Sequence, residues 1–192
     1  KNETINNALR KYLLLSLIMI AGMSTGLTVQ GQTTNSDRKL VSADKTAVKY
    51  GFIKVDGLNI AYREAGDPAN PKVVLLHGFP AASHQYRDLI RSLSGKFHVI
   101  APDYPGFGLS DIPDPAKYDY TFEGISQIVE HFLTLKGFTH YGLYAQDYGG
   151  PVGFRIVGRN PKALDWLIVQ NTNAYEVGFT AVWDGLRGAL WK

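Results

Sequence analysis

The sequence contains no cysteine among its 192 residues. Disulfide bonds, thiolate metal sites and a cysteine nucleophile are therefore excluded for this chain. It also has no internal repeat and no biased composition, which excludes solenoid and collagen-like architectures. What is present is 45% hydrophobic and 12% aromatic, a composition sufficient for one globular domain with a buried core.

The chain also has little net charge. Its formal charge is +3, and Lys1, Arg10 and Lys11, offset by Glu3, place two of these charges in the first eleven residues. About one positive charge is left for the remainder of the chain. No basic face is then available to attract nucleic acid, and we expect no nucleic-acid partner.

The N-terminal segment has the pattern of a bacterial-type signal peptide. Arg10 and Lys11 precede an apolar run over residues 12–27, and residues 29–31 carry the branched and small side chains that a signal peptidase inspects. The run is short for a membrane span, and an uncleaved anchor is the alternative. We expect residues 1–31 to be removed, which makes the protein periplasmic or secreted, with no stable membrane anchor.

Residues 32–48 are polar and lack a periodic pattern, so we expect a tether there. Beyond it, strand-like and helix-like segments alternate, beginning with a hairpin whose turn is Asp56-Gly57. Repeated β-α units predict an α/β fold, with a mostly parallel sheet and helices on both faces. The predicted strands cover residues 50–55, 58–63, 73–76, 97–101, 141–145 and 164–169, and the predicted helices cover 86–93, 121–137 and 152–157.

The segment Ala145-Gln146-Asp147-Tyr148-Gly149-Gly150 joins a predicted buried strand to a predicted helix. Its small residues at fixed spacing suit a turn so tight that the central residue, Asp147, takes a strained backbone conformation and points into a pocket. An ordinary acidic turn, with glycines for positive φ, is the simpler interpretation of this segment alone.

Two further motifs follow predicted strands. His77-Gly78-Phe79-Pro80 comes directly after residues 73–76; Gly78 allows close backbone approach, and Pro80 stiffens the loop. The segment 103–111, DYPGFGLSD, contains Gly-x-Gly but lacks a third glycine and carries a proline, so we reject a nucleotide site. We interpret that segment as a structural loop beside the pocket.

The motifs HGFP, DYPGFGLSD and AQDYGG, in this order and spacing, resemble the α/β-hydrolase group that contains epoxide hydrolases and haloalkane dehalogenases. The resemblance covers roughly residues 50–192. It implies that Asp147 is a nucleophile and that the backbone N–H groups of Phe79 and Tyr148 form an oxyanion hole. His77, Gly78, Pro80, Gly149 and Gly150 would support these groups. Residues 49–175 would be the N-terminal part of the hydrolase domain, and residues 176–192 the start of a cap.

The resemblance places a histidine base after the last strand of the fold and an orienting acid after the sixth or seventh. None of the five histidines has that late position, and Asn171 occupies the early position of the acid. We assign His77 to the oxyanion loop, His98 to packing in a strand, and His84, His131 and His140 to solvated positions. We expect the base and the acid beyond Lys192, with the fold truncated before its C-terminal strands and most of its cap. This fragment alone would then be inactive.

A carboxylate nucleophile suits displacement at saturated carbon, through an ester of Asp147. Related dehalogenases usually have tryptophan after the nucleophile, and many have asparagine after His-Gly, whereas Tyr148 and Phe79 stand here. Related epoxide hydrolases also prefer tryptophan after the nucleophile, but their ring-opening acids are cap tyrosines that would lie largely downstream. Epoxide hydrolysis of a small organic substrate is therefore favoured by elimination. The alternatives are a haloalkane dehalogenase-like hydrolase and a non-catalytic relative or binding protein. No cofactor and no metal is expected.

Overall fold

The computed structural model describes residues 44–185. The predicted signal peptide and residues 32–43 of the predicted tether lie outside them. The last tether residues run along the folded domain, where the Lys45 carbonyl accepts a hydrogen bond from the Gly66 N–H at 2.7 Å and the Lys45 ammonium pairs with Asp67. Within residues 44–185, no helix is long and apolar enough to cross a membrane.

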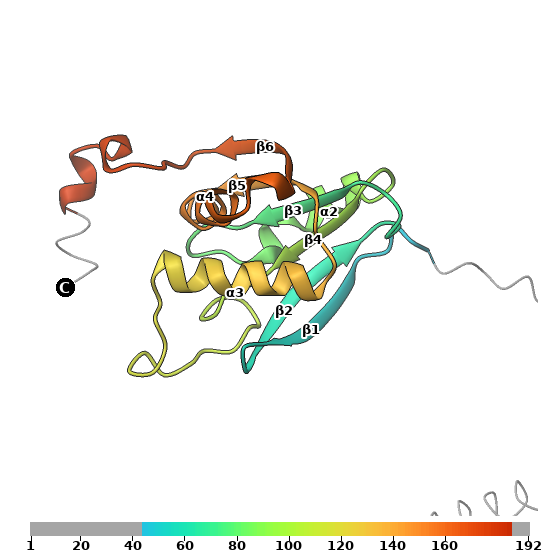
Figure 1. Cartoon of the computed structure of the whole chain (residues 1–192), viewed down its shortest axis with the longest axis horizontal. Coiled ribbons are helices and arrows are strands. Elements are labelled where there is room, and N and C mark those ends of the chain that lie inside the picture. The colour runs from blue at the N-terminus through green and yellow to red at the C-terminus, as the bar shows by residue number, and fades with distance from the viewer. Residues whose placement is uncertain (1–43, 186–192) are drawn as a thin grey trace, which may run out of the picture. The chain divides into compact units, whose positions relative to one another are not determined.

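Six strands form one mixed sheet in the order β1-β2-β4-β3-β5-β6 (Figure 1). The first two pairings, β1 with β2 and β2 with β4, are antiparallel, and the other three are parallel. This confirms the predicted α/β fold with a mostly parallel sheet. The strands are β1 (Lys49–Val55), β2 (Leu58–Ala65), β3 (Lys72–Leu76), β4 (His98–Pro102), β5 (Tyr141–Gln146) and β6 (Leu164–Gln170).

The predicted hairpin joins β1 and β2. Asp56 and Gly57 have φ values of 48° and 89°. Positive φ at both central residues is the geometry of the two-residue turn that matches the twist of paired strands. The predicted turn chemistry therefore sets the register, in which Val55 pairs with Leu58.

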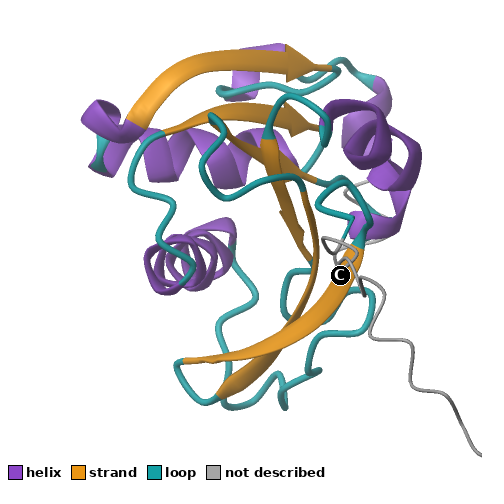
Figure 2. Ribbon diagram, turned by 90° about the vertical axis from the view of Figure 1, so that its right-hand side faces the viewer, coloured by secondary structure: helices purple, strands orange, loops and turns teal. Residues whose placement is uncertain are grey.

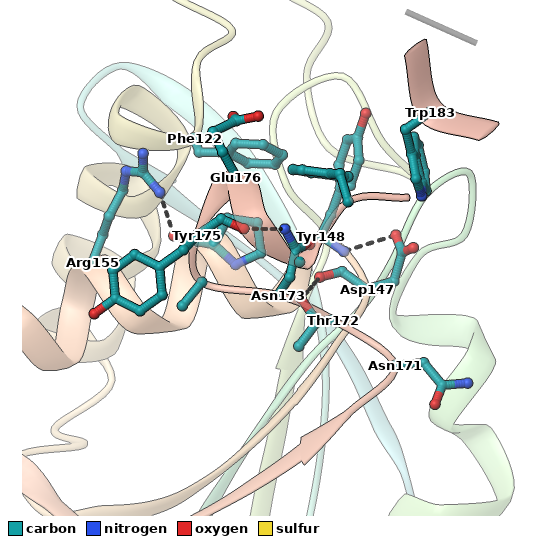
Figure 3. Close-up of a pocket in the computed structure, with 14 residues that line it drawn as sticks. Phe122, Asp147, Tyr148, Arg155, Asn171, Thr172, Asn173, Tyr175, Glu176 and Trp183 are labelled. Atoms are coloured by element: carbon teal, nitrogen blue, oxygen red, sulfur yellow. Dashed lines mark hydrogen bonds between the residues drawn. The ribbon is translucent and has the colours of Figure 1, made fainter. Parts of the chain in front are cut away.

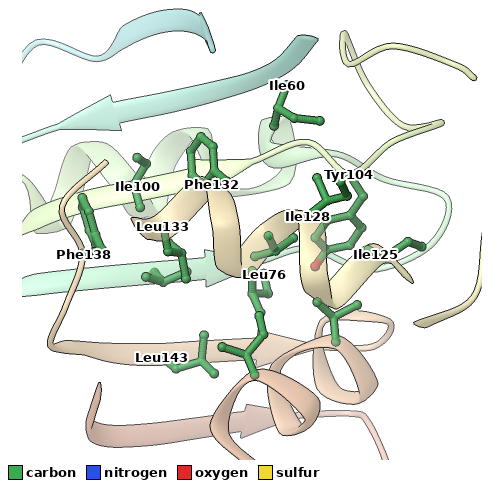
Figure 4. Packing of buried hydrophobic residues seen from close by; sticks show 14 of the residues in the cluster. Ile60, Leu76, Ile100, Tyr104, Ile125, Ile128, Phe132, Leu133, Phe138 and Leu143 are labelled. Atoms are coloured by element: carbon green, nitrogen blue, oxygen red, sulfur yellow. The ribbon is translucent and has the colours of Figure 1, made fainter. Parts of the chain in front are cut away.

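Helices cover both faces of the sheet (Figure 2). The helices α3 (Phe122–Leu135) and α4 (Gly149–Arg159) pack on one face, and η1 (Ser83–Tyr86) with α2 (Arg87–Leu93) packs on the other. The first face carries the larger core, in which Phe132, Leu76 and Leu143 are fully buried (Figure 4). The remaining short helices are η2 (Pro161–Ala163) and η3 (Glu176–Gly178).

The start and end of α3 depend on the residues at the two limits of the predicted helix, 121 and 137. The Thr121 side chain accepts a hydrogen bond from the Gly124 N–H at 3.1 Å, which satisfies one of the free donors at the helix start. Gly137, at φ 72°, ends the helix in the left-handed region.

The carboxyl ends of the parallel strands lie at one edge of the sheet, where ligands bind in open α/β folds. The loops after β3, β4, β5 and β6 leave from this edge. The HGFP, DYPGFGLSD and AQDYGG motifs are therefore brought together from three separate parts of the chain.

Candidate active site

Asp147 occupies a tight turn between β5 and α4. Its φ is 52°, a left-handed value that costs a non-glycine residue of the order of 1–3 kcal/mol. A Cβ on Gly149 would overlap the Leu76 carbonyl oxygen, and a Cβ on Gly150 would overlap the Thr172 side chain. The neighbouring segments therefore leave room only for glycine at positions 149 and 150. The left-handed backbone at Asp147 places its side chain at the cavity.

Two backbone N–H groups donate to the same oxygen of Asp147. The Phe79 nitrogen lies 2.8 Å from Oδ1, and the Tyr148 nitrogen lies 2.7 Å from it (Figure 3 shows the second bond). These are the two residues that the resemblance implied as oxyanion donors. Oδ1 of the carboxylate is therefore held between the two N–H groups, whereas Oδ2 accepts neither of these two bonds.

The loop before Phe79 approaches Asp147 closely. A Cβ on Gly78 would lie 2.5 Å from the Asp147 Cβ, which explains why glycine is needed there. The Phe79–Pro80 peptide bond is cis.

His77 fixes the orientation of the peptide group between Gly78 and Phe79. The Tyr104 N–H donates to Nε2 at 3.3 Å, so the ring proton is on Nδ1, which donates to the Gly78 carbonyl at 3.0 Å. With the Gly78 carbonyl held on one side, the Phe79 N–H on the other side faces Asp147. His77 is fully buried, and this burial lowers its pKa to about 4, so the ring is neutral near pH 7.

Thr172 is a supporting residue that the sequence analysis did not single out. Its hydroxyl donates to the Asp147 carbonyl at 2.6 Å from the loop after β6 (Figure 3). The turn is therefore held from the neighbouring strand as well as from within. The sequence signal was weak, because Thr172 reaches Asp147 only through the parallel pairing of β5 with β6.

The structure agrees with a supporting role for the DYPGFGLSD loop. Asp103 is buried, and its two carboxylate oxygens accept hydrogen bonds from the Ser83 N–H at 2.7 Å and the Leu109 N–H at 3.0 Å. A Cβ on Gly108 would overlap the Asp103 carboxylate. Asp103 is thus occupied in tying the loop to η1.

A cavity of about 970 Å³ opens beside Asp147. The rings of Tyr148 and Phe122, which both line it, pack together with 4.8 Å between their centroids, and Phe79 packs against Tyr148 at 5.4 Å. Burial, followed by the charge of Asp147, raises the pKa of Tyr148, so its phenol is neutral near pH 7. The lining residues are Phe122, Asp147, Tyr148, Pro151, Arg155, Asn171, Thr172, Asn173, Ala174, Tyr175, Glu176, Gly178, Phe179 and Trp183 (Figure 3).

The other histidines lie where the sequence analysis placed them. His98 is 5% exposed, and its Nε2 lies 2.7 Å from Glu64. His84, His131 and His140 are exposed. Among residues 44–185, no histidine is hydrogen-bonded to Asp147, and no cluster of side chains could hold a metal ion.

Comparison with known proteins identifies the same fold. The family model for the alpha/beta hydrolase fold matches residues 71–187. An uncharacterised hydrolase of Saccharomyces cerevisiae is 40% identical over 137 residues, which is 71% of this chain and 47% of that protein. A cis-3-alkyl-4-alkyloxetan-2-one decarboxylase of Shewanella oneidensis is 33% identical over 144 residues, covering 74% of this chain and 44% of that protein.

A solved structure is similar as well. A loop variant of the haloalkane dehalogenase DbeA from Bradyrhizobium elkanii superimposes with a TM-score of 0.60 at 30% identity, covering 64% of this chain and 40% of that chain. The chain spans about half the length of the curated relatives it matches.

Proposed function

Since the chain belongs to the α/β-hydrolase fold family, we propose that Asp147 is a nucleophile that opens a small epoxide through an alkyl ester. The observation that carries this proposal is the position of its carboxylate. Asp147 sits on a strained turn, with Oδ1 accepting two backbone N–H bonds at 2.8 and 2.7 Å.

The two oxygens of Asp147 have different parts in the reaction. Oδ2 attacks a saturated ring carbon, the carbon–oxygen bond of the ring breaks, and its electron pair stays on the ring oxygen, which takes up a proton from water. In the second step water gives up a proton and attacks the Asp147 carboxyl carbon, and the negative charge develops on Oδ1. Collapse of this intermediate breaks the bond between the carboxyl carbon and Oδ2, which leaves as part of the diol and takes up a proton. Because Oδ1 already lies between the Phe79 and Tyr148 N–H groups, the stabilising donors are in place before that charge forms.

The side chains near Asp147 favour an oxygen leaving group. At the two positions where related dehalogenases commonly carry side-chain N–H donors, Phe79 presents a hydrocarbon ring and Tyr148 a neutral phenol. The Shewanella relative is named for a substrate with a four-membered ring containing oxygen, which is also a strained cyclic electrophile. Strained carbon–oxygen rings are thus the substrates that best match the residues present.

Haloalkane dehalogenation is the second candidate, and the similarity to DbeA favours it. It uses the same attack by Oδ2, with halide in place of alkoxide as the leaving group. Both reactions need a base that activates water, and no histidine among residues 44–185 is placed to act as one. His77 has both ring nitrogens occupied and a pKa of about 4, and the other four histidines lie elsewhere.

Intact-mass spectrometry after incubation with electrophiles separates the candidates without requiring turnover. An epoxide adds its entire mass to the protein, because the opened oxygen is retained, whereas a haloalkane adds its mass less that of hydrogen halide. We expect a single epoxide adduct on the wild-type chain and none on Asp147→Asn. An adduct with haloalkane only would select dehalogenation. No adduct with either would favour the remaining alternative, a non-catalytic binding protein.

A further inference from the structure

The two backbone donors to Asp147 belong to segments that are far apart in the sequence. Phe79 follows β3, whereas Tyr148 follows β5, and both N–H groups must point at one oxygen. Stabilisation of a developing oxyanion depends on donors at about 2.7–3.1 Å from it. The spacing between the HGFP loop and the Asp147 turn therefore needs a device that holds it.

Gln85 connects these two segments. Its Oε1 accepts a hydrogen bond from the Gly78 N–H at 3.3 Å, and its Nε2 donates to the Gln146 Oε1 at 2.8 Å. Gly78 immediately precedes one donor residue, and Gln146 immediately precedes Asp147. We call this Gln85–Gln146 pair, with its bond to Gly78, the amide bridge.

The surroundings of the amide bridge fix where it sits. A Cβ on Gly78 would lie 2.9 Å from the Gln146 Oε1, so the bridge lies close to the loop backbone and leaves no room there for a larger side chain. The next residue of η1, Tyr86, donates its hydroxyl to the Leu76 carbonyl at 2.8 Å. The short helix η1 is therefore hydrogen-bonded to the end of β3 through Tyr86 and to the loop that follows β3 through Gln85.

We propose that the amide bridge is a positioning device that sets the two oxyanion donors at a common distance from Asp147 Oδ1. A side-chain amide suits this task because it offers both a donor and an acceptor without a charge beside the carboxylate. Gln85 and Gln146 are thus positioning residues that act through the backbone of Gly78 and Asp147. The catalytic consequence rests on the proposed function, whereas the structural consequence does not.

Hydrogen exchange of backbone amides tests the structural consequence. In Gln146→Leu, which removes the acceptor for Gln85, we expect protection of the Gly78 and Phe79 amides to fall about tenfold, because local opening there becomes easier. Gln146→Glu keeps an acceptor oxygen for Gln85 but adds a charge beside Asp147, so it should retain more of the protection than Gln146→Leu does. The matched control is Gln127→Leu on α3, whose amide bonds only to Glu123 among the described contacts.

Two results would overturn the amide bridge. One is unchanged protection of the Phe79 amide in both Gln85→Leu and Gln146→Leu. The other is an equal loss in core amides such as those of Val129 and Phe132, because the pair would then stabilise the whole domain rather than this loop.

The catalytic consequence is tested on the Asp147 ester with hydroxylamine. Hydroxylamine attacks the ester carbonyl, releases the alcohol and leaves a hydroxamate on Asp147, so it reports on the oxyanion hole without a histidine base. In Gln85→Leu we expect the rate of ester cleavage by hydroxylamine to fall about tenfold. The rate of ester formation should fall less, because only cleavage places a new charge on Oδ1. Cleavage in denaturant should be equal in both proteins.

The two ways of failing are distinguishable. An ester that forms on the wild type but is cleaved at the same rate in Gln85→Leu refutes the catalytic part of the inference. Absence of any wild-type ester refutes the proposed function instead, and the exchange experiment still decides whether the amide bridge positions the loop.

Discussion

The segments on the two sides of Asp147 are built in different ways. On one side, which we call the elbow side, are the HGFP loop, the Asp147 turn and the loop that holds Asp103. There His77, Gly78 and Asp103 are buried, and each is hydrogen-bonded to a neighbouring segment. On the other side, Tyr175 is 78% exposed and Val177 is 92% exposed. Asn173 and Gly178 both bond to the Tyr175 carbonyl, within the same short segment.

This difference separates reaction geometry from substrate choice. The position of the carboxylate and its two N–H donors is set by strand pairing and buried loops, which tolerate little change. The segment after β6 shapes the cavity from an exposed position, where substitutions are tolerated more easily. Under the proposed function, we expect the elbow side to set the kind of chemistry and the exposed side to decide which molecule undergoes it.

Among the substitutions that test this contrast, Gly78→Ala should have the largest effect on the free energy of unfolding. The new methyl group would lie 2.5 Å from the Asp147 Cβ, so the loop and the turn must separate. We expect a loss of about 3 kcal/mol in the free energy of unfolding, at the upper end for an overpacked site. Urea denaturation measures it. Gly95→Ala is the control, since nothing lies within 4 Å of its Cβ, and a similar loss there would refute the contrast.

Acid should weaken the elbow side through His77. Its folded pKa is about 4, below the ordinary value of 6.5, so the unfolded chain binds the proton more readily. The stability due to the neutral ring is complete above pH 6.5 and is lost as the pH falls toward 4. We expect a loss of about 2 kcal/mol between pH 7.5 and pH 5.

Urea denaturation at both pH values measures this loss. His77→Gln keeps an amide donor for the Gly78 carbonyl but cannot titrate, so its stability should vary less over the same range. An equal slope in the variant and the wild type would show that other groups cause the acid sensitivity.

Thr172→Val tests the bond between the two parallel strand ends. The substitution keeps the shape of the side chain but leaves the Asp147 carbonyl without its 2.6 Å donor. The carbonyl still accepts from the Gly150 N–H at 2.9 Å, so we expect a loss of about 1 kcal/mol in the free energy of unfolding, typical of one intramolecular hydrogen bond. Thr134→Val on α3, where the hydroxyl bonds to Glu130 on an exposed helix surface, is the comparison and should change stability less.

The smallest effect is expected on the exposed side. Tyr175→Ala should change the free energy of unfolding by less than about 0.5 kcal/mol, because most of its ring is in solvent. A thermal melt is sufficient to measure this. If Tyr175→Ala destabilised the protein as much as Gly78→Ala, the two sides would not differ in the way described.

The sequence predicts the strands, the helices and the Asp147 turn well, since each depends on local periodicity or on glycine at a fixed spacing. Thr172 and the amide bridge could not be found in this way. Thr172 meets Asp147 only because β6 lies beside β5, and Gln85 meets Gln146 across 61 positions of sequence. Contacts that depend on strand order carry no signal in the spacing of a single sequence.

The proposed function requires that Asp147 itself forms the ester. Tandem mass spectrometry can locate the modification in the peptide that contains Asp147 after reaction with a small epoxide. We expect the added mass on the Asp147 carboxylate, with the buried Asp103 unmodified. Modification of another carboxylate such as Glu176, with Asp147 unchanged, would contradict it.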